Sequence, residues 1–377
     1  MTTALIHSDA YTRFDYGPEH PLRMERLGLT WRLMRAYGLT EIAQAKVLTP
    51  EPADEAIICR YHGRQYVELL KKVSAGERVP TAPLYGLGFG DNPIFPGLWE
   101  VSCLAVGGSL LAARLVADGE VDRAFHFAGG LHHALPDRAS GFCYLNDPVL
   151  AILHLRQKGW RVCYVDIDAH HGDGVQFAFY RDRDVLTIST HERGDRLFPG
   201  TGFVHELGEE DGKGYSVNLP LQPFTDDEVY AETFEAVVPP LIQAFRPDVV
   251  VAQLGIDSHR TDPLTHLALT VQGFTRTVAR IAELSPRLVA LGGGGYDLPN
   301  VARAWTAAWA VLNGVELAPE LPPAFSDDLR RFGFRSGSLW DPPEPLPPET
   351  RRQAEEYARA QVEALRRTVF PIHGLTC

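Results

Sequence analysis

Cysteine is scarce in this chain. Five cysteines occur in 377 residues, and no two of them form a CxxC pair. An odd number with this spacing argues against a disulfide framework and against a structural zinc knuckle. We therefore expect most of the cysteines to be reduced, buried, small residues; they are Cys59, Cys103, Cys143, Cys163 and Cys377.

Basic side chains are in the minority. The chain has 36 Lys and Arg residues against 48 Asp and Glu residues, which gives a formal net charge of −12. Proteins that coat nucleic acid or bind anionic membranes need clustered Lys and Arg side chains. The composition therefore predicts neither a nucleic-acid partner nor a membrane partner.

Long apolar runs are missing as well. Residues 1–17, "MTTALIHSDAYTRFDYG", have neither a basic start nor an apolar run long enough for a signal peptide. We find no stretch that approaches the roughly 18 consecutive apolar residues of a membrane helix. The sequence therefore predicts a cytoplasmic protein.

Buried strands are the clearest local signal. The chain is 45% hydrophobic and 22% charged, which is ordinary for a folded globular protein. Five short apolar runs are bounded by turn residues and lack alternation, which is the pattern of a parallel sheet covered on both faces. They are "RAFHFAGG" from 123, "RVCYVDID" from 161, "VLTISTH" from 185, "PDVVVAQLG" from 247 and "RLVALGGGGY" from 287.

Helical segments alternate with these strands. "DPVLAILHLRQKG" precedes one strand, and "PNVARAWTAAWAVLNG" follows another, with Trp305 and Trp309 on one apolar face that we expect to pack in the core. Alternation predicts a single α/β domain over residues 1–377, a three-layer αβα arrangement around a mostly parallel central sheet. Within it, residues 340–377 are expected to form a Pro-rich tether and a C-terminal amphipathic helix packed on the outside.

Polar side chains collect where the predicted strands end. His132 and His133, then residues 166–173, then Asp257, then Tyr296 each come at or just past the last apolar residue of a strand. In open α/β sheets, ligands bind outside the carboxyl ends of the strands. These residues are therefore expected to meet at one site.

Asp168 and His170 are candidate metal ligands. They are two residues apart in an extended run, so their side chains point the same way. Alone, such a pair is more often a cap or an ion pair, but Asp257 supplies a third ligand at the end of another strand. Two carboxylates and one imidazole leave a coordination position open for water, as catalytic Zn²⁺ requires, and Fe(II) or Mn(II) would also suit them.

His132 and His133 are not needed as ligands and are candidates for acid–base chemistry. A hydrolase needs a base for water and an acid for the leaving amine, and histidine serves both purposes near neutral pH. Asp166 and Asp173 flank the metal motif and are available to fix the two imidazole tautomers. An isolated His-His pair is more often structural than catalytic.

Tyr296 ends the run "GGGGY". The glycines permit backbone conformations that place the tyrosine over an open site, where its hydroxyl stabilises an oxyanion. A phosphate cradle is disfavoured, because no Lys-Ser/Thr follows and the glycines are not spaced as GxGxxG. The remaining histidines near strand ends are interpreted as hydrogen-bonded structural residues: His126, His171, His191 and His259.

Six ordered motifs carry a family resemblance. "AGGLHHA", "GFCYLND", "DIDAHHGDGVQ", "FPGTG", "QLGIDS" and "LGGGGY" together resemble the zinc-dependent histone deacetylase superfamily, closest to its bacterial deacetylase-like and acetoin-utilisation members of class I type. "DYGPEHPLRMERL" and "ARAWTAAW" extend the likeness over residues 5–315. The resemblance implies the arginase/deacetylase fold and hydrolysis of acetyl-lysine or of related acetylated amines.

The resemblance also implies roles for single residues. Asp168, His170 and Asp257 become the Zn²⁺ ligands, His133 the general base and acid oriented by Asp173, His132 its electrostatic partner held by Asp166, and Tyr296 the group that polarises the acetyl carbonyl. Gly141, Phe142 and Phe198 match the walls of a narrow acyl-lysine tunnel, Leu264 and Asp91 its rim, and Arg26 an inner channel.

A structural K⁺ ion is a further implication of the resemblance. Family members hold this ion near the site through backbone oxygens and one hydroxyl. The matching positions here are the backbones of Asp166, Asp168, His170 and Thr190 and the hydroxyl of Ser189.

Two rival functions are weighed against the same residues. Arginase-like ureohydrolases share the architecture but use two manganese ions, and here Gly172 and His259 stand where their additional carboxylates are required. A non-catalytic acyl-ligand sensor is disfavoured because His133 and Tyr296 are both present. The regions 80–93 and 258–269 differ from the eukaryotic enzymes, so acetylated protein lysine, acetylpolyamine and another small amide all stay open as substrates.

Overall fold

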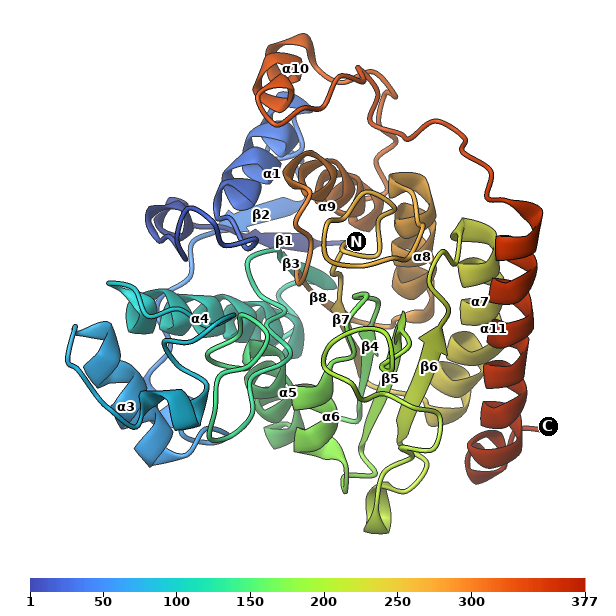
Figure 1. The fold of residues 1–377 in the computed structure, drawn as a ribbon, viewed down its shortest axis with the longest axis horizontal. Helices are drawn as coiled ribbons and strands as arrows, with labels where there is room; N and C mark the ends of the chain where they lie inside the picture. Colours follow the sequence, from blue (N-terminus) through green and yellow to red (C-terminus); the bar gives the residue numbers. More distant parts are fainter. Residues whose placement is uncertain (377) are drawn as a thin grey trace.

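The computed structural model describes residues 1–376 and places eight strands in one sheet (Figure 1). The strands are β1 Thr3–Ile6, β2 Ala45–Leu48, β3 Arg123–His126, β4 Val162–Asp166, β5 Val185–Glu192, β6 Ser216–Leu221, β7 Val249–Gln253 and β8 Leu288–Leu291. Their order is β2-β1-β3-β8-β7-β4-β5-β6, and every neighbouring pair is parallel. All their carboxyl ends therefore lie at the same edge.

Helices cover both faces of this sheet (Figure 1). The α-helices are α1 Glu25–Ala36, α2 Glu55–Ile58, α3 Arg64–Ser74, α4 Leu98–Ala117, α5 Asp147–Gln157, α6 Asp173–Phe179, α7 Asp227–Phe245, α8 Val271–Leu284, α9 Leu298–Leu312, α10 Pro323–Arg330 and α11 Pro348–Thr368. Short 3₁₀ turns are η1 Asp9–Arg13, η2 Ala82–Tyr85, η3 Glu210–Gly212 and η4 Phe370–His373. The predicted three-layer αβα fold around a parallel sheet is confirmed.

Alternate residues of each central strand enter different hydrophobic cores. In β4, Val162 and Tyr164 pack in the cluster that includes α4 and α5, whereas Cys163 and Val165 pack in the cluster with α7, α8 and α9. Both sets are buried, which explains why the strands appear as unbroken apolar runs in the sequence. Trp305 belongs to the second core, as predicted, and so does Trp309.

Side-chain caps fix where several helices begin. The Asn146 side chain accepts a hydrogen bond from the backbone N–H of Val149 at the start of α5, and the Asp226 side chain caps α7 in the same way. Thr270 caps α8. Such caps satisfy backbone donors that a helix leaves unpaired at its first turn.

Helix α4 is the one helix among the described residues that is long and apolar enough to cross a membrane, by length and composition only. Its 20 residues contain no run of 18 consecutive apolar residues, so the observation made from the sequence holds. Its most apolar window is 72% buried inside the fold, and it packs against β3 and α5. The window contains small residues such as Ala and Gly instead of an unbroken run of large apolar ones.

The C-terminal region forms a long helix after its Pro-rich segment. After the Pro-rich segment, α11 packs against α7 and β6, with Ala358 and Leu365 buried in the large core (Figure 1). The cysteines also agree with expectation: Cys103, Cys143 and Cys163 are buried, Cys59 is half-buried, and none of these four forms a disulfide. Cys377 lies outside the described residues.

Candidate active site

Three side chains form a candidate metal centre at the carboxyl edge of the sheet. Asp168 and His170 follow β4, Asp257 follows β7, and one ligand atom from each lies within 4.8 Å of the others. His170 Nδ1 is 2.8 Å from Asp257 Oδ2 and 3.2 Å from Asp168 Oδ1. All three are buried, so the side chains selected from the sequence are brought together.

Neighbouring backbone and amide groups hold the two carboxylates in place. Asp168 Oδ2 accepts hydrogen bonds from Gln253 Nε2 at 2.7 Å and from the Gly294 N–H at 2.8 Å. Asp257 Oδ1 accepts one from the Ala169 N–H at 2.7 Å. Each carboxylate is thus anchored by donors that favour its charged form and fix its orientation.

Glycine is required where the backbone passes these carboxylates. A Cβ atom on Gly255 would lie 2.0 Å from Asp168 Oδ2, and one on Gly294 would lie 2.1 Å from Asp257 Oδ2. No larger residue fits these approaches without moving a carboxylate. The "GGGGY" run therefore serves the ligands as well as the tyrosine that follows it.

The donor set fits a divalent cation. Burial, followed by repulsion from Asp168, raises the pKa of Asp257 to about 6. Two buried carboxylates at this separation repel each other unless positive charge lies between them. Two oxygen donors and one imidazole satisfy Zn²⁺, Fe(II) or Mn(II) and leave room for further ligands.

The paired histidines form two His–Asp dyads. His132 Nδ1 lies 2.8 Å from Asp166 Oδ2, and His133 Nδ1 lies 2.7 Å from Asp173 Oδ1. Asp166 Oδ2 also accepts a hydrogen bond from the Tyr164 hydroxyl at 2.8 Å. The carboxylates favour a proton on each Nδ1 atom. The two Nε2 atoms lie 3.0 Å apart, within hydrogen-bond distance of each other.

Their surroundings separate the two imidazoles electrostatically. Burial by itself lowers the pKa of His132, but the carboxylates of Asp166 and Asp168 outweigh it and raise that pKa to about 9. Burial, followed by the charge on His132, lowers the pKa of His133 to about 4. These surroundings therefore favour the protonated form of His132 and the neutral form of His133.

Tyr296 closes the site from the end of β8. Burial, followed by Asp257, raises its pKa well above the ordinary value, so the hydroxyl stays protonated and able to donate. Gly293 and Gly295, with φ of 141° and 136°, carry the chain through conformations that favour glycine. Arg26 fixes this segment, because its Nη1 donates to the Gly293 oxygen at 2.8 Å and to the Gly295 oxygen at 3.1 Å.

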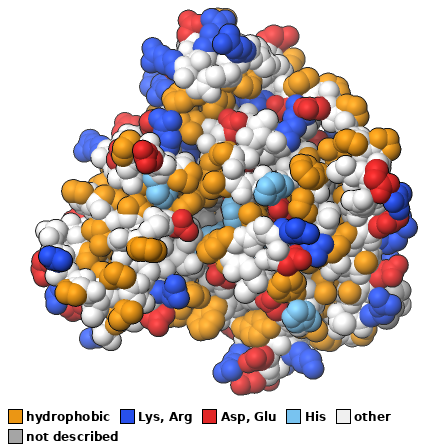
Figure 2. All heavy atoms as spheres, in the orientation of Figure 1, with side chains coloured by type: hydrophobic (Ala, Val, Ile, Leu, Met, Phe, Trp, Pro, Cys, Tyr) orange, Lys and Arg blue, Asp and Glu red, His pale blue; other side chains and the backbone are white. Residues whose placement is uncertain are grey.

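A narrow cavity of about 20 Å³ reaches the paired histidines, Asp168 and Tyr296. It is lined by Leu22, Arg26, Gly130, Leu131, His132, His133, Gly141, Phe142, Cys143, Asp168, Gly293, Gly294 and Tyr296. The Phe142 ring lies 5.6 Å from that of Tyr296, and the Phe198 ring lies 5.0 Å from that of His133. Figure 2 shows histidine at the floor of a central hollow bordered by hydrophobic side chains.

Two predicted rim residues lie outside this lining. Leu264 is half-buried in the segment after β7, where its N–H donates to Asp262 Oδ1 at 3.0 Å. Asp91 is exposed, and its backbone oxygen lies 3.1 Å from His20 Nε2. Neither residue lines the cavity, and a rim role for them stays a prediction.

The predicted K⁺ positions cluster on neighbouring strands. Asp166 and Ser189 are register partners of β4 and β5, and Thr190 follows on β5. The Ser189 hydroxyl lies 2.8 Å from His191 Nδ1, and Thr190 Oγ1 is buried without a hydrogen-bond partner among the described residues. These positions leave K⁺ binding as a prediction.

The remaining histidines agree with their structural interpretation. Each has hydrogen-bonding partners: His126 with Tyr11 and Ser109, His171 with Thr201 and Gln176, His191 with Ser189 and the Gly202 oxygen, and His259 with Asp341, Asn300 and Thr261. His259 therefore lies in a hydrogen-bond network away from the ligand trio.

Several supporting residues were missed from the sequence. Gln253 holds Asp168, and Asp262 Oδ2 accepts the N–H of Tyr296 at 2.8 Å. Asp147 accepts hydrogen bonds from the N–H groups of Gly130 and Leu131, directly before the paired histidines. A signal was present in part, because Gln253 stands in "QLGIDS" and Asp147 in "GFCYLND", but nothing in either motif indicates its partner.

Comparisons with known proteins agree with this geometry. A family model described as the histone deacetylase domain matches residues 20–312. The acetoin utilization protein AcuC of Bacillus subtilis is 38% identical over 364 residues, which cover 94% of this chain and 93% of AcuC. Histone deacetylase B of Dictyostelium discoideum is 41% identical over 308 residues, 81% of this chain and 72% of that protein.

Solved structures show the same likeness. The crystal structure of an HDAC homolog from Aquifex aeolicus superposes with a TM-score of 0.86 at 31% identity. The match covers 95% of this chain and 100% of the Aquifex chain. A structure of an HDAC homolog complexed with SAHA matches to the same extent, with a TM-score of 0.86 and 31% identity.

Proposed function

The chain belongs to the histone deacetylase family, and from this membership we propose that it is a zinc-dependent amidohydrolase that removes acetyl groups from acetyl-lysine side chains or from related acetylated amines. One observation carries the proposal: the ligand trio, both His–Asp dyads and Tyr296 converge at a single edge of the sheet. Base, oxyanion donor and metal ligands are the parts that amide hydrolysis requires.

Asp168, His170 and Asp257 would hold the metal ion, and zinc suits this donor set. When bound, such an ion supplies Lewis acidity, which polarises a carbonyl and acidifies water. The anchoring of both carboxylates by N–H donors supports a site prepared for the ion before it arrives.

His133 is proposed to move the protons. Its neutral Nε2 accepts a proton from the attacking water, and Asp173 at 2.7 Å from Nδ1 stabilises the imidazolium that results. The same proton then passes to the leaving nitrogen, and the second proton of the water also ends on the amine, so that water and amide become acetate and an ammonium ion. The cationic His132, held by Asp166, adds positive charge beside the developing oxyanion.

Tyr296 is proposed to donate a hydrogen bond to the acyl oxygen as negative charge develops there. Burial keeps its hydroxyl protonated, and Arg26 fixes the glycine segment that presents it. A donor already in place costs no reorganisation during the reaction.

The substrate is proposed to enter as an extended aliphatic stem. Phe142 beside Tyr296 and Phe198 beside His133 support a slot that accepts a methylene chain and excludes branched groups. Acetylated protein lysine and acetylated small amines both carry such a stem. The likeness to AcuC supports an acetylated metabolite or protein connected with acetoin use.

A ureohydrolase is not supported. Among residues 1–376, Asp168, His170 and Asp257 are the one group of side chains arranged to hold a metal, and His259 is bonded to Asp341 at 2.9 Å. A second metal ion would need further carboxylates at the site.

We further propose that K⁺ binds at the positions named above, that residues 1–377 form one domain, and that the protein is cytoplasmic.

Removal and return of the metal test the function. The protein is stripped of metal, Zn²⁺, Fe(II) or Mn(II) is restored singly, and acetate release from an acetyl-lysine peptide is measured. Release that depends on the metal and is blocked by a hydroxamate supports the proposal. Stoichiometric metal binding without release from the peptide or from an acetylated diamine would contradict it.

A further inference from the structure

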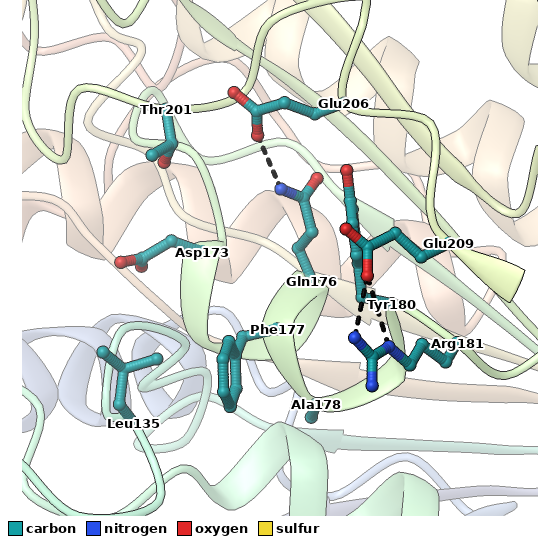
Figure 3. Close-up of a pocket in the computed structure, with 10 residues that line it drawn as sticks. All are labelled: Leu135, Asp173, Gln176, Phe177, Ala178, Tyr180, Arg181, Thr201, Glu206 and Glu209. Carbon is teal, nitrogen blue, oxygen red and sulfur yellow. Dashed lines mark hydrogen bonds and ion pairs between the residues drawn. The ribbon is translucent and has the colours of Figure 1, made fainter. Parts of the chain in front are cut away.

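A second cavity is lined by Asp173, the partner of His133, and by Leu135 from the segment after the paired histidines (Figure 3). Its volume is about 710 Å³, and it is lined by Leu135, Asp173, Gln176, Phe177, Ala178, Tyr180, Arg181, Thr201, Glu206 and Glu209. Cavities of roughly 300–1,000 Å³ are typical of small-molecule sites. Only Asp173 among these residues belongs to the proposed active site.

Asp173 connects this cavity to His133. Its Oδ1 lies 2.7 Å from His133 Nδ1, whereas Oδ2 has no hydrogen-bond donor among the described residues. The side chain is 18% exposed, and Figure 3 shows it between Thr201 on one side and Leu135 and Phe177 on the other. One carboxylate therefore faces the catalytic base and the cavity at once.

The lining selects for positive charge. It holds the carboxylates of Asp173, Glu206 and Glu209 against the single guanidinium of Arg181, a formal balance of −2. Arg181 is bonded to Glu209 at 2.9 Å, and Glu206 already accepts from Gln176 Nε2 at 2.7 Å. Asp173 Oδ2 and Glu209 Oε1 are thus the carboxylate oxygens without a donor among the described residues, and the Glu209 charge is already balanced by Arg181.

Aromatic surface lies next to this charge. The Phe177 side chain is 60% exposed on α6, and Tyr180 follows it one turn later. A cation on an apolar stem gains from an aromatic face and from a carboxylate together, because the ring attracts the charge and the stem leaves water. Neutral and anionic molecules gain only part of this.

We propose that this cavity is a second binding site, which takes an organic ammonium or guanidinium group at Asp173 Oδ2 while its apolar stem packs on Phe177. Its effect on turnover rests on the proposed function. A cation at Oδ2 draws charge away from the hydrogen bond that orients His133, so occupancy lowers kcat. The acyl slot stays open, so KM for the acetylated substrate is unchanged.

Direct binding tests the site without reference to activity. Phenethylammonium is titrated into the whole protein in a calorimeter, with phenethyl alcohol as the neutral probe of the same shape. A fragment of this size is expected to bind at about 1 mM. Phe177→Ala and Asp173→Asn should each weaken binding about tenfold, as loss of the aromatic face or of the charge implies.

Phe89→Ala is the matched control, because Phe89 is 81% exposed and lies outside the cavity. It should bind phenethylammonium as the unchanged protein does. Thermal melting checks that every variant is folded. Equal affinity of all variants, or equal affinity for the alcohol and the ammonium, would overturn the site.

Kinetics then test the coupling. In the metal-loaded protein, phenethylammonium should lower kcat on an acetyl-lysine peptide at constant KM, and Phe177→Ala should remove the effect. A rise in KM at constant kcat would place the probe in the acyl slot and overturn the coupling. If the protein hydrolyses no acetylated substrate, the proposed function is contradicted. The calorimetric titration still tests whether phenethylammonium binds in the cavity.

Discussion

Tyr296 contributes a single hydroxyl, so its role separates cleanly from those of the metal ligands. Phe at this position keeps the ring that packs on Phe142 and removes only the donor. Loss of one preorganised oxyanion donor costs on the order of a hundredfold or more in turnover. Tyr296→Phe should therefore lower kcat by about that factor, measured by steady-state hydrolysis of an acetyl-lysine peptide.

The control for this substitution is Tyr357→Phe, which removes a hydroxyl from α11 far along the chain and should leave kcat unchanged. Metal content of both variants is measured alongside turnover. Near wild-type kcat in Tyr296→Phe, with metal bound, would remove the tyrosine from the mechanism.

Gly294 leaves room for the candidate metal ligands because it has no side chain. A Cβ there would lie 2.1 Å from Asp257 Oδ2, so Gly294→Ala must displace a ligand or the strand end that carries it. Disturbed ligand support typically costs 10–100-fold in metal affinity. We expect a loss of about that size, measured by competition of the stripped protein with a zinc-binding dye.

Gly337→Ala is the matched substitution, since a Cβ at Gly337 meets no atom within 4 Å and the backbone there needs no left-handed conformation. It should bind zinc as the unchanged protein does. Unaltered zinc affinity in Gly294→Ala would mean that the Asp257 carboxylate tolerates the added Cβ atom. The requirement for glycine at this position would then be contradicted.

The candidate site was predictable at the residue scale wherever chemistry follows a strand directly. Asp168, His170 and Asp257 come at strand ends, and parallel strands bring such ends to one edge. Gln253 and Asp262 were not predictable, because each acts on a partner tens of residues away and carries no spacing signal. The cavity behind Asp173 was invisible too, since it depends on how the segment 201–209 folds over α6.

Strands were predictable from the sequence where they lie towards the middle of the sheet and form an unbroken apolar run. β3, β4, β5, β7 and β8 are buried and read as unbroken apolar runs. The three strands that were missed lie at or near the sheet's edges. β1 is buried but only four residues long, β2 is partly exposed, and β6 is buried but contains Pro220 and alternates polar with apolar residues. Proline is tolerated in an edge strand because the backbone on the solvent side of that strand needs no hydrogen-bond donor. A proline within a short run nevertheless makes the run look like a loop in the sequence.

Helix α11 tests whether the C-terminal region is one folding unit with the sheet. Leu365 is fully buried between α11 and the core shared with β6 and α7. Leu365→Ala should lower the free energy of unfolding by about 2–5 kcal/mol, the usual range for a buried leucine. Urea unfolding followed by far-UV circular dichroism gives this value.

Arg366→Ala, an exposed neighbour on the same helix, should change the unfolding free energy by less than about 0.5 kcal/mol. Coincident single transitions by circular dichroism and by tryptophan fluorescence are expected for both variants. A separate early transition for α11 in Leu365→Ala would divide the chain into two units and contradict the single domain.

At the scale of the whole molecule, buried ionisable groups couple folding to pH in opposing directions. Burial lowers the pKa of His62 to about 4 and that of His126 to about 3, so both fold as neutral rings. Burial raises the pKa of Asp147 to about 6, so this carboxyl tends to bind its proton on folding. The total slope of stability against pH mixes these terms, and only a difference between variants isolates one of them.

His62 offers that difference. Its folded pKa of about 4 lies below the unfolded value of 6.5, so the unfolded chain binds more protons between these limits and stability falls as pH drops through them. His62 Nε2 accepts the Asn146 N–H at 2.9 Å, and Gln at this position offers an acceptor that does not titrate. Relative to His62→Gln, the unchanged protein should lose about 3 kcal/mol between pH 7 and pH 4.

Urea unfolding of both proteins at half-unit steps of pH measures this loss, and the values at pH 7 set the fixed cost of the substitution itself. His132, with a folded pKa of about 9 against an unfolded value of 6.5, binds its proton more tightly when folded, so its contribution to stability rises as pH falls through 6.5. This contribution is the same in both proteins and cancels in the difference between them. Parallel curves for His62→Gln and the unchanged protein would contradict the prediction. They would mean that the buried His62 ring binds its proton equally well in the folded and unfolded chains.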